Sequence, residues 1–211
     1  VDARLRPDGT KGPLVSTLDA FRDYYSKAAH FWEFQALLKA RPVAGNRTAG
    51  CSFMEMRRDV LLGKGGGVSA SDIRSMRERI LKELSKETEG YDVKLGTGGI
   101  EELEFTVQYL QLKNALKRKD ILVQGTVDAI RRLETAGIID GIASDIMEET
   151  YIFYRTIESL LRLKGEPVLK KDTIAASDIA EFMGFKDSGE FFGHMDGKMG
   201  RINALFERFL C

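Results

Sequence analysis

The first six residues of the chain alternate between apolar and polar side chains. The apolar members are Val1, Ala3 and Leu5. Because successive side chains of a β-strand point to opposite faces of a sheet, the pattern predicts a short strand with Asp2, Arg4 and Arg6 on its polar face. Residues 7–9, Pro-Asp-Gly, are typical of a turn and end the predicted strand.

The period changes after this turn. Apolar residues then recur three or four positions apart, at Leu18, Phe21, Tyr25, Ala28, Trp32 and Ala36. This spacing predicts a single amphipathic helix that runs to about Arg41, where Pro42 and Gly45 end it. A shorter helix is expected over residues 53–62. Residues 64–67, Lys-Gly-Gly-Gly, have no preceding strand and no GK[ST] ending, so they indicate a flexible linker rather than a phosphate-binding loop.

Helical periodicity dominates the remainder of the chain. A stripe that begins at Ile73 predicts a helix capped by Ser71, and alternation over residues 91–95 predicts a second short strand. From Gly99 onward the expected helices cover residues 99–116, 126–136, 144–164, 177–183 and 188–210. The fold class expected is therefore mainly α with a small β part.

The helix expected after Gly99 carries two stripes. The apolar stripe consists of Ile100, Leu103, Val107 and Leu110, and the polar stripe consists of Glu101, Glu104, Gln108 and Gln111. The polar stripe either faces solvent or lines a polar cleft at the edge of the core. The loop of Gly96, Gly98 and Gly99 could offer backbone N–H groups to an anion, but the acidic first turn of the helix favours simple stabilisation of the helix start.

Composition narrows the class of protein. The 32 basic and 32 acidic residues balance, so the chain lacks the basic excess of a general nucleic-acid binder. Cys51 and Cys211 are too few for a disulfide framework, which favours a reducing, cytoplasmic compartment. No signal-peptide pattern and no apolar run of about 18 residues occurs, so neither secretion nor a membrane span is expected.

The predicted first strand is the strongest candidate for chemistry. One acid beside two bases is either a solvated face with local ion pairs or a site for a metal and a phosphate. A carboxylate such as that of Asp2 is a hard ligand for Mg²⁺, and the guanidinium groups of Arg4 and Arg6 suit phosphate oxygens. The pattern by itself leaves both possibilities open.

Four stretches in order carry a family resemblance: VDARLRPDGTKGPLV, FRDYY, FWEFQALLKARPVAG and DVKLGTGGIEELEFTVQYL. Together they resemble glutamine synthetase adenylyltransferase, a large bifunctional bacterial enzyme, over most of residues 1–112. The stretches FMGFKDSGEFF and RINALFERFL resemble the end of the same module.

The resemblance implies a nucleotidyltransferase fold followed by a helical domain. Residues 1–66 would be the C-terminal part of the nucleotidyltransferase domain and residues 67–211 the helical domain. One module of the family transfers AMP from ATP to a tyrosine of glutamine synthetase, and the other removes it by phosphorolysis. The implied partners are glutamine synthetase and the PII signal protein, in the cytoplasm.

The resemblance also assigns site residues. Asp2 would be the third carboxylate of the Mg²⁺ site, with Arg4 and Arg6 beside it for phosphate oxygens. Lys94, Glu104 and Gln108 would form a second set of nucleotide- or phosphate-binding residues.

The chain departs from the family pattern in one respect. No G-S-x-x-D-x-D-like element, which supplies the other metal carboxylates in the family, occurs in the 211 residues. The chain is therefore interpreted as part of a module with an incomplete active site, inactive by itself. VDARLRP, VQYL and the final LFERFLC favour the adenylylating module, whereas KLGTGG is closer to the deadenylylating one. A helical interaction module that binds PII or glutamine synthetase, and a relative of PII uridylyltransferase, remain alternatives.

Overall fold

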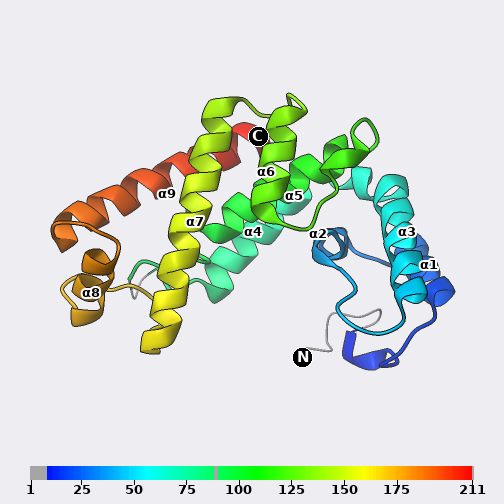
Figure 1. Ribbon diagram of the computed structural model, residues 1–211, viewed down its shortest axis with the longest axis horizontal. Coiled ribbons are helices and arrows are strands. Elements are labelled where there is room, and N and C mark those ends of the chain that lie inside the picture. Colours follow the sequence, from blue (N-terminus) through cyan, green and yellow to red (C-terminus); the bar gives the residue numbers. More distant parts are fainter. Residues whose placement is uncertain (1–8, 88–89, 211) are drawn as a thin grey trace. The chain divides into compact units, whose positions relative to one another are not determined.

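The computed structural model describes residues 9–87 and 90–210 of the chain (Figure 1). In that part helices account for nearly all regular structure. The α-helices are α1 (Leu18–Lys27), α2 (Phe31–Lys39), α3 (Arg47–Gly63), α4 (Ala70–Leu84), α5 (Ile100–Asn114), α6 (Thr126–Thr135), α7 (Gly141–Lys164), α8 (Ile174–Phe182) and α9 (Ser188–Leu210). The short 3₁₀ helices are η1 (Gly9–Lys11), η2 (Gly65–Gly67) and η3 (Lys119–Ile121). The chain divides into two compact units, residues 1–68 with 108–129, and residues 69–107 with 130–211.

The mainly helical class is confirmed, but the β part is not found among the described residues. There, β pairing is limited to an isolated bridge, in which the Tyr91 N–H donates to the Leu169 carbonyl at 2.8 Å and the reverse bond measures 3.0 Å. The strand predicted over residues 91–95 is wrong because residues 93–95 form a turn. The alternation that suggested a strand arises from a turn with exposed Lys94 between buried Val93 and half-buried Leu95. The strand predicted at the start of the chain, residues 1–6, lies outside the described residues.

The single helix predicted over residues 18–41 is wrong, since the chain forms α1 and α2 with a break at residues 28–30. Glu33 accounts for the break. Its carboxylate accepts a hydrogen bond from the His30 N–H at 2.7 Å and another from the Tyr24 hydroxyl at 2.7 Å. A side chain from the first turn thereby satisfies the start of α2, as in a capping box. The apolar spacing continues through the break and conceals it.

The core of the first unit surrounds a buried arginine. Arg57 on α3 is only 2% exposed. Its Nε donates to the Leu37 carbonyl at 2.8 Å and its Nη2 to the Leu38 carbonyl at 2.5 Å. These carbonyls belong to the last turn of α2, where a cation also interacts favourably with the helix dipole. Burial lowers the pKa of Arg57.

The expected glycine linker is a packed turn. Residues 65–67 form η2, and Gly65 is buried in the first unit. A Cβ atom at Gly65 would lie 2.9 Å from Leu112 Cδ2. The absence of a side chain therefore serves close packing here rather than flexibility.

The second unit is built mainly from α4, α7, α8 and α9. Figure 1 shows α8 near the ends of α7 and α9, and all three pack against one another. Their buried cluster comprises Val93, Ile100, Tyr154, Ile157, Leu161, Leu169, Ala176, Ile179, Ala180, Phe191, Phe192 and Met195. α9 has the bounds predicted from the sequence, whereas α7 and α8 begin three residues early. The side chains of Asp140 and Thr173 cap them by accepting hydrogen bonds from the N–H groups of Ala143 and Ala176.

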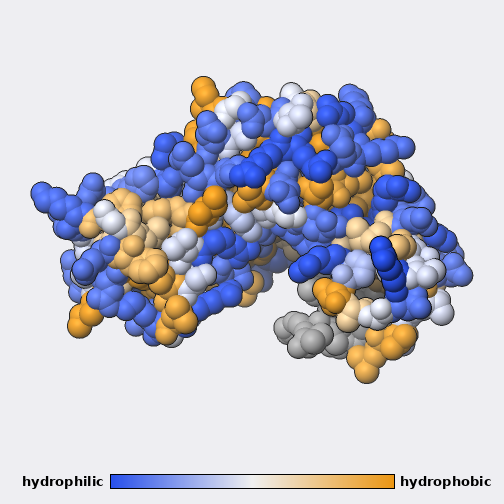
Figure 2. Space-filling model, in the orientation of Figure 1, coloured by the Kyte–Doolittle hydropathy of each residue, from blue (hydrophilic) through white to orange (hydrophobic). Residues whose placement is uncertain are grey.

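The face of the molecule drawn in Figure 2 is largely hydrophilic. Hydrophobic residues on that face lie near α8 and also around α5 and α6. The most exposed large apolar side chains of the second unit include Leu163, Ile174 and Phe182. None of the helices in residues 9–87 and 90–210 has the length and apolar character needed to cross a membrane.

Candidate functional site

The structure describes three of the six predicted site residues. Asp2, Arg4 and Arg6 lie outside the described part of the chain, so their assignment stays a prediction. Lys94 is exposed on the turn before α5. Glu104 lies on the part of α5 that belongs to the second unit, and Gln108 lies on the part that belongs to the first.

The backbone N–H groups of the glycine-rich loop before α5 all donate hydrogen bonds to acceptors within the protein. The Asp92 Oδ1 atom accepts from the N–H groups of residues 94 and 95, and Glu87 Oε1 accepts from the Thr97 N–H at 2.6 Å. The N–H groups of residues 96, 99, 100 and 101 donate to the carbonyls of residues 92, 96, 93 and 94. The Gly98 N–H donates to Glu102 Oε2 at 2.8 Å. Every N–H from residue 94 to 101 is therefore engaged, and the loop is not an anion-binding cradle.

Glu102 joins three segments of the second unit. It is 3% exposed, and its Oε1 accepts from the Nε atom of Arg77 on α4 at 3.1 Å. Arg77 Nη2 lies 3.0 Å from the same oxygen but lacks hydrogen-bond geometry. Oε2 also accepts from the Asn203 side chain of α9 at 3.2 Å. The acidic first turn of α5 therefore binds the protein's own donors.

Glu104 belongs to an ion-pair network between α5 and α7. Its Oε1 accepts from the Tyr151 hydroxyl at 2.9 Å and from Arg155 Nη2 at 3.2 Å. Arg155 Nη1 also donates to Glu158 at 2.7 Å. Although burial opposes it, contact with Glu158 and Tyr151 raises the pKa of Arg155. Burial raises the pKa of the neighbouring Glu101, and Lys94 opposes that shift. The polar stripe of α5 thus carries a half-buried charged network in the second unit.

Gln108 is a buried member of the first unit. Its Oε1 accepts from the Gln35 side chain of α2 at 2.9 Å, and both residues are less than 9% exposed. Gln111, one turn later, donates to the carbonyls of Ile121 and Val123 at 2.6 and 3.0 Å. Gln35 Oε1 has no hydrogen-bond partner among the described residues. The amide end of the predicted stripe is therefore buried, not solvated.

The amide pair permits a test of its structural role. Gln35→Met and Gln108→Met should each destabilise the protein by about 1–3 kcal/mol, because each leaves a buried amide without its partner. The double variant should lose clearly less than the sum, since both polar groups are then gone. Urea unfolding of the four proteins measures the coupling. Gln124→Met, at a half-buried position of the same unit, is the control, and strictly additive losses would contradict an energetic link between the two amides.

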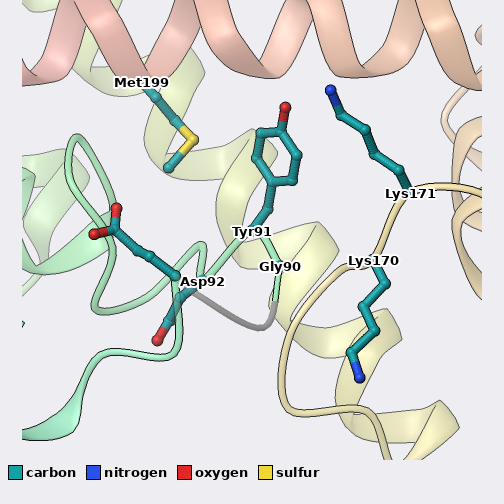
Figure 3. A pocket seen from close by; sticks show the side chains of 7 residues that line it. Gly90, Tyr91, Asp92, Lys170, Lys171 and Met199 are labelled. Atoms are coloured by element: carbon teal, nitrogen blue, oxygen red, sulfur yellow. The ribbon is translucent and has the colours of Figure 1, made fainter.

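A pocket of about 510 Å³ adjoins the loop. Its lining residues are Glu87, Gly90, Tyr91, Asp92, Lys170, Lys171 and Met199. Figure 3 shows Tyr91 and Lys171 directed toward α9, whereas Lys170 points away from it. The Lys171 ammonium lies 5.4 Å from the Tyr91 ring centroid, and the Tyr91 hydroxyl donates to Asp196 at 2.9 Å. Because most of these polar groups are engaged with one another or with the loop, the pocket adds no residue to the candidate site.

The described residues do not form a metal site. Among residues 9–87 and 90–210, no group of three or more His, Cys, Asp or Glu side chains is placed to hold a metal ion. Asp2 stays the candidate ligand that the sequence supplies.

The sequence pattern does not single out Arg77, Glu102 or Arg155, although each makes polar contacts around the start of α5. Their partners lie 25, 101 and 51 positions away along the chain. Arg155 and Glu158 stand three apart on α7, a spacing that predicts a local ion pair. That spacing could have identified Arg155 from the sequence. Contacts between residues far apart in the chain, such as that of Arg77 with Glu102, leave no local pattern in the sequence.

Comparison with protein families gives two matches, on separate segments of the chain. A model described as glutamate-ammonia ligase adenylyltransferase matches residues 1–56. A model described as GlnD PII-uridylyltransferase matches residues 72–210. Both descriptions are of nucleotidyltransferases.

Similar curated proteins extend across both segments. The bifunctional glutamine synthetase adenylyltransferase/adenylyl-removing enzyme of Cutibacterium acnes is 37% identical over 195 residues, which covers 90% of this chain and 20% of that protein. The protein of the same name from Streptomyces avermitilis is 34% identical over 190 residues, or 88% of this chain and 19% of the relative. The chain thus spans about a fifth of the length of these relatives.

The two family models place the chain in the class of nucleotidyltransferases, and the described part of the chain is nearly all helical. Within that class, the chain belongs to the family of bifunctional glutamine synthetase adenylyltransferase/adenylyl-removing enzymes. The resemblance found in the sequence motifs is confirmed.

Proposed function

We propose that this chain is part of an enzyme that transfers AMP from ATP to a tyrosine of glutamine synthetase and so regulates nitrogen assimilation. The observation that carries the proposal is the 37% identity that continues over 90% of the chain to a protein named for this activity. The adenylylating module is favoured over the adenylyl-removing one because VDARLRP, VQYL and LFERFLC resemble it. ATP is the nucleotide substrate, and glutamine synthetase is the protein substrate.

Residues 1–66 are assigned to the nucleotidyltransferase domain and residues 67–211 to the helical domain. The family models support a boundary here, since one ends at residue 56 and the other begins at residue 72. The first compact unit also ends its first segment at residue 68, although it includes residues 108–129 as well.

The residues contribute charge and position rather than covalent chemistry. Asp2 is proposed as one carboxylate ligand of a catalytic Mg²⁺ ion, which would neutralise charge on the reacting phosphates. Arg4 and Arg6 are proposed to bind phosphate oxygens, since guanidinium groups form paired hydrogen bonds with them. Lys94 is proposed to contact the nucleotide, and its exposed position supports that role.

The surroundings of Glu104 and Gln108 support a role in nucleotide binding to different degrees. Glu104 is half-buried and bonded to Arg155, so its role is to hold the charged network beside the nucleotide. The Gln108 Oε1 atom accepts a hydrogen bond from Gln35 inside the first unit. A direct contact between Gln108 and the nucleotide would therefore have to use an atom that this hydrogen bond does not engage. Gln108 is therefore the weakest of the proposed binding residues.

A binding module is the second candidate function. The match of residues 72–210 to a PII-uridylyltransferase model favours it, because this region is shared between enzymes with different protein substrates. In that case the helical part would bind the PII signal protein or glutamine synthetase, without itself taking part in transfer.

Labelled ATP distinguishes the two possibilities. The 211-residue chain alone should transfer no AMP to glutamine synthetase, because the G-S-x-x-D-x-D-like element is absent, whereas the full-length protein should transfer it. Retention of label on glutamine synthetase, with and without Mg²⁺, is the measurement. Metal-dependent transfer by the isolated chain would show that its active site is complete. A full-length protein that binds glutamine synthetase but transfers nothing would favour the binding module.

A further inference from the structure

Glu102 is a buried carboxylate for which the proposed reaction has no direct use. It is 3% exposed in the first turn of α5, and Arg77 and Asn203 approach it from α4 and α9. Isolated buried ion pairs contribute little to stability compared with apolar residues of the same volume. The buried carboxylate of Glu102 is therefore better explained by a role in fixing the geometry of the segments around it.

The geometry that Glu102 imposes is that of the loop before α5. The bond from the Gly98 N–H to Glu102 Oε2 at 2.8 Å holds one side of the loop. The Tyr154 hydroxyl holds the other side by donating to the Gly98 carbonyl at 3.1 Å. Gly98 has φ of +71°, and a Cβ atom there would lie 2.0 Å from the Met199 carbonyl oxygen. The loop therefore packs closely against the backbone of α9, and two hydrogen bonds fix it at residue 98.

The same loop carries Lys94. The Lys94 carbonyl accepts from the Glu101 N–H at 3.0 Å, and the Val93 carbonyl accepts from the Ile100 N–H at 2.9 Å. The Lys94 N–H in turn donates to Asp92 Oδ1 at 3.2 Å. The position of the Lys94 backbone thus depends on the start of α5, which Glu102 anchors to α4 and α9.

We propose that Glu102 is a positioning residue that fixes the loop of residues 94–99 and thereby places Lys94 for contact with the nucleotide. The proposal rests on the proposed nucleotide contact of Lys94. Glu102 itself touches no substrate. Its carboxylate acts through the backbone, and Arg77 and Asn203 keep that carboxylate in place.

The test is a double-mutant cycle in the full-length protein, with AMP transfer to glutamine synthetase as the assay. Lys94→Met should raise KM for ATP about ten-fold, as expected for one lost charged contact. Glu102→Gln keeps the side-chain volume but loses the ion pair with Arg77, and it should also raise KM for ATP, with a smaller effect on kcat. In the Lys94→Met background, Glu102→Gln should raise KM no further, since the two residues act as a unit.

Controls separate positioning from stability. Glu149→Gln changes an α7 carboxylate that is 72% exposed, and it should leave KM for ATP unchanged. If Glu102→Gln does not fold, Asn203→Leu removes one donor to Glu102 and should raise KM in the same direction by a smaller factor.

Several results would overturn the proposal. An unchanged KM in Glu102→Gln beside a raised KM in Lys94→Met would overturn the positioning role while leaving the nucleotide contact intact. Equal effects of Glu102→Gln with and without Lys94 would show that Glu102 does not act through that lysine. An absence of AMP transfer by the wild-type full-length protein would instead overturn the proposed function itself.

Discussion

Asp2→Asn in the full-length protein should remove most of the turnover of the module that contains this chain. Asparagine keeps the size of the side chain but lacks the negative charge that a hard cation requires. A catalytic metal supplies several kcal/mol of transition-state stabilisation, so the expected loss is roughly 100-fold or more. AMP transfer and phosphorolytic removal are measured separately, because the second module should continue to work.

Asp8→Asn is the matched control for this experiment. Asp8 stands in the predicted Pro-Asp-Gly turn, six positions from Asp2, and the family resemblance assigns it no metal contact. It should leave both activities near the wild-type rate. If Asp2→Asn also left both activities at that rate, Asp2 would not be the third metal carboxylate.

Apolar spacing predicted most helices because a buried stripe repeats every three to four residues. The last helix is the clearest case. Its buried residues include Phe191, Met195, Ile202 and Phe206, and its bounds of residues 188–210 agree with the prediction. Where the stripe is long and continuous, burial decides the structure and the sequence reports it directly.

Helix ends and breaks were harder to predict because single side chains decide them. The break before α2 depends on the hydrogen bonds of Glu33 to His30 and Tyr24, and no glycine or proline marks it. At α8, Thr173 and Ser177 are both acceptable caps, and the structure selects the threonine. Local propensity allows several starts, and the packing of the helix selects one of them.

The sequence likewise predicted some features of the candidate site and not others. The sequence could mark Glu104 as part of a polar stripe, and the structure shows the network that this stripe enters. The stripe could not show that Gln108 would be buried against Gln35, 73 positions earlier in the chain. It also could not show the partners of Glu102, because those contacts join α4, α5 and α9 across long separations. Residues 1–6 stay a sequence prediction.

Gly98→Ala is expected to be among the most destabilising single substitutions in the second unit. The backbone at Gly98 has φ of +71°, a conformation that costs L-residues roughly 1–2 kcal/mol. The added methyl group would also lie 2.0 Å from the Met199 carbonyl oxygen, and this contact is with backbone rather than with a flexible side chain. Relief would require separating the loop from α9, so we expect a total loss of about 3 kcal/mol or more in the free energy of unfolding.

Gly165→Ala isolates the contact from the backbone conformation. Gly165 ends α7 with the same φ of +71°, but no atom lies within 4 Å of the position that its Cβ would occupy. This variant should therefore lose only the conformational part, about 1–2 kcal/mol. Urea unfolding followed by circular dichroism measures both. Because Glu102 and Tyr154 hold the loop by hydrogen bonds, moving it away from α9 should cost free energy. Equal losses of unfolding free energy in the two variants would show that the loop moves without that cost.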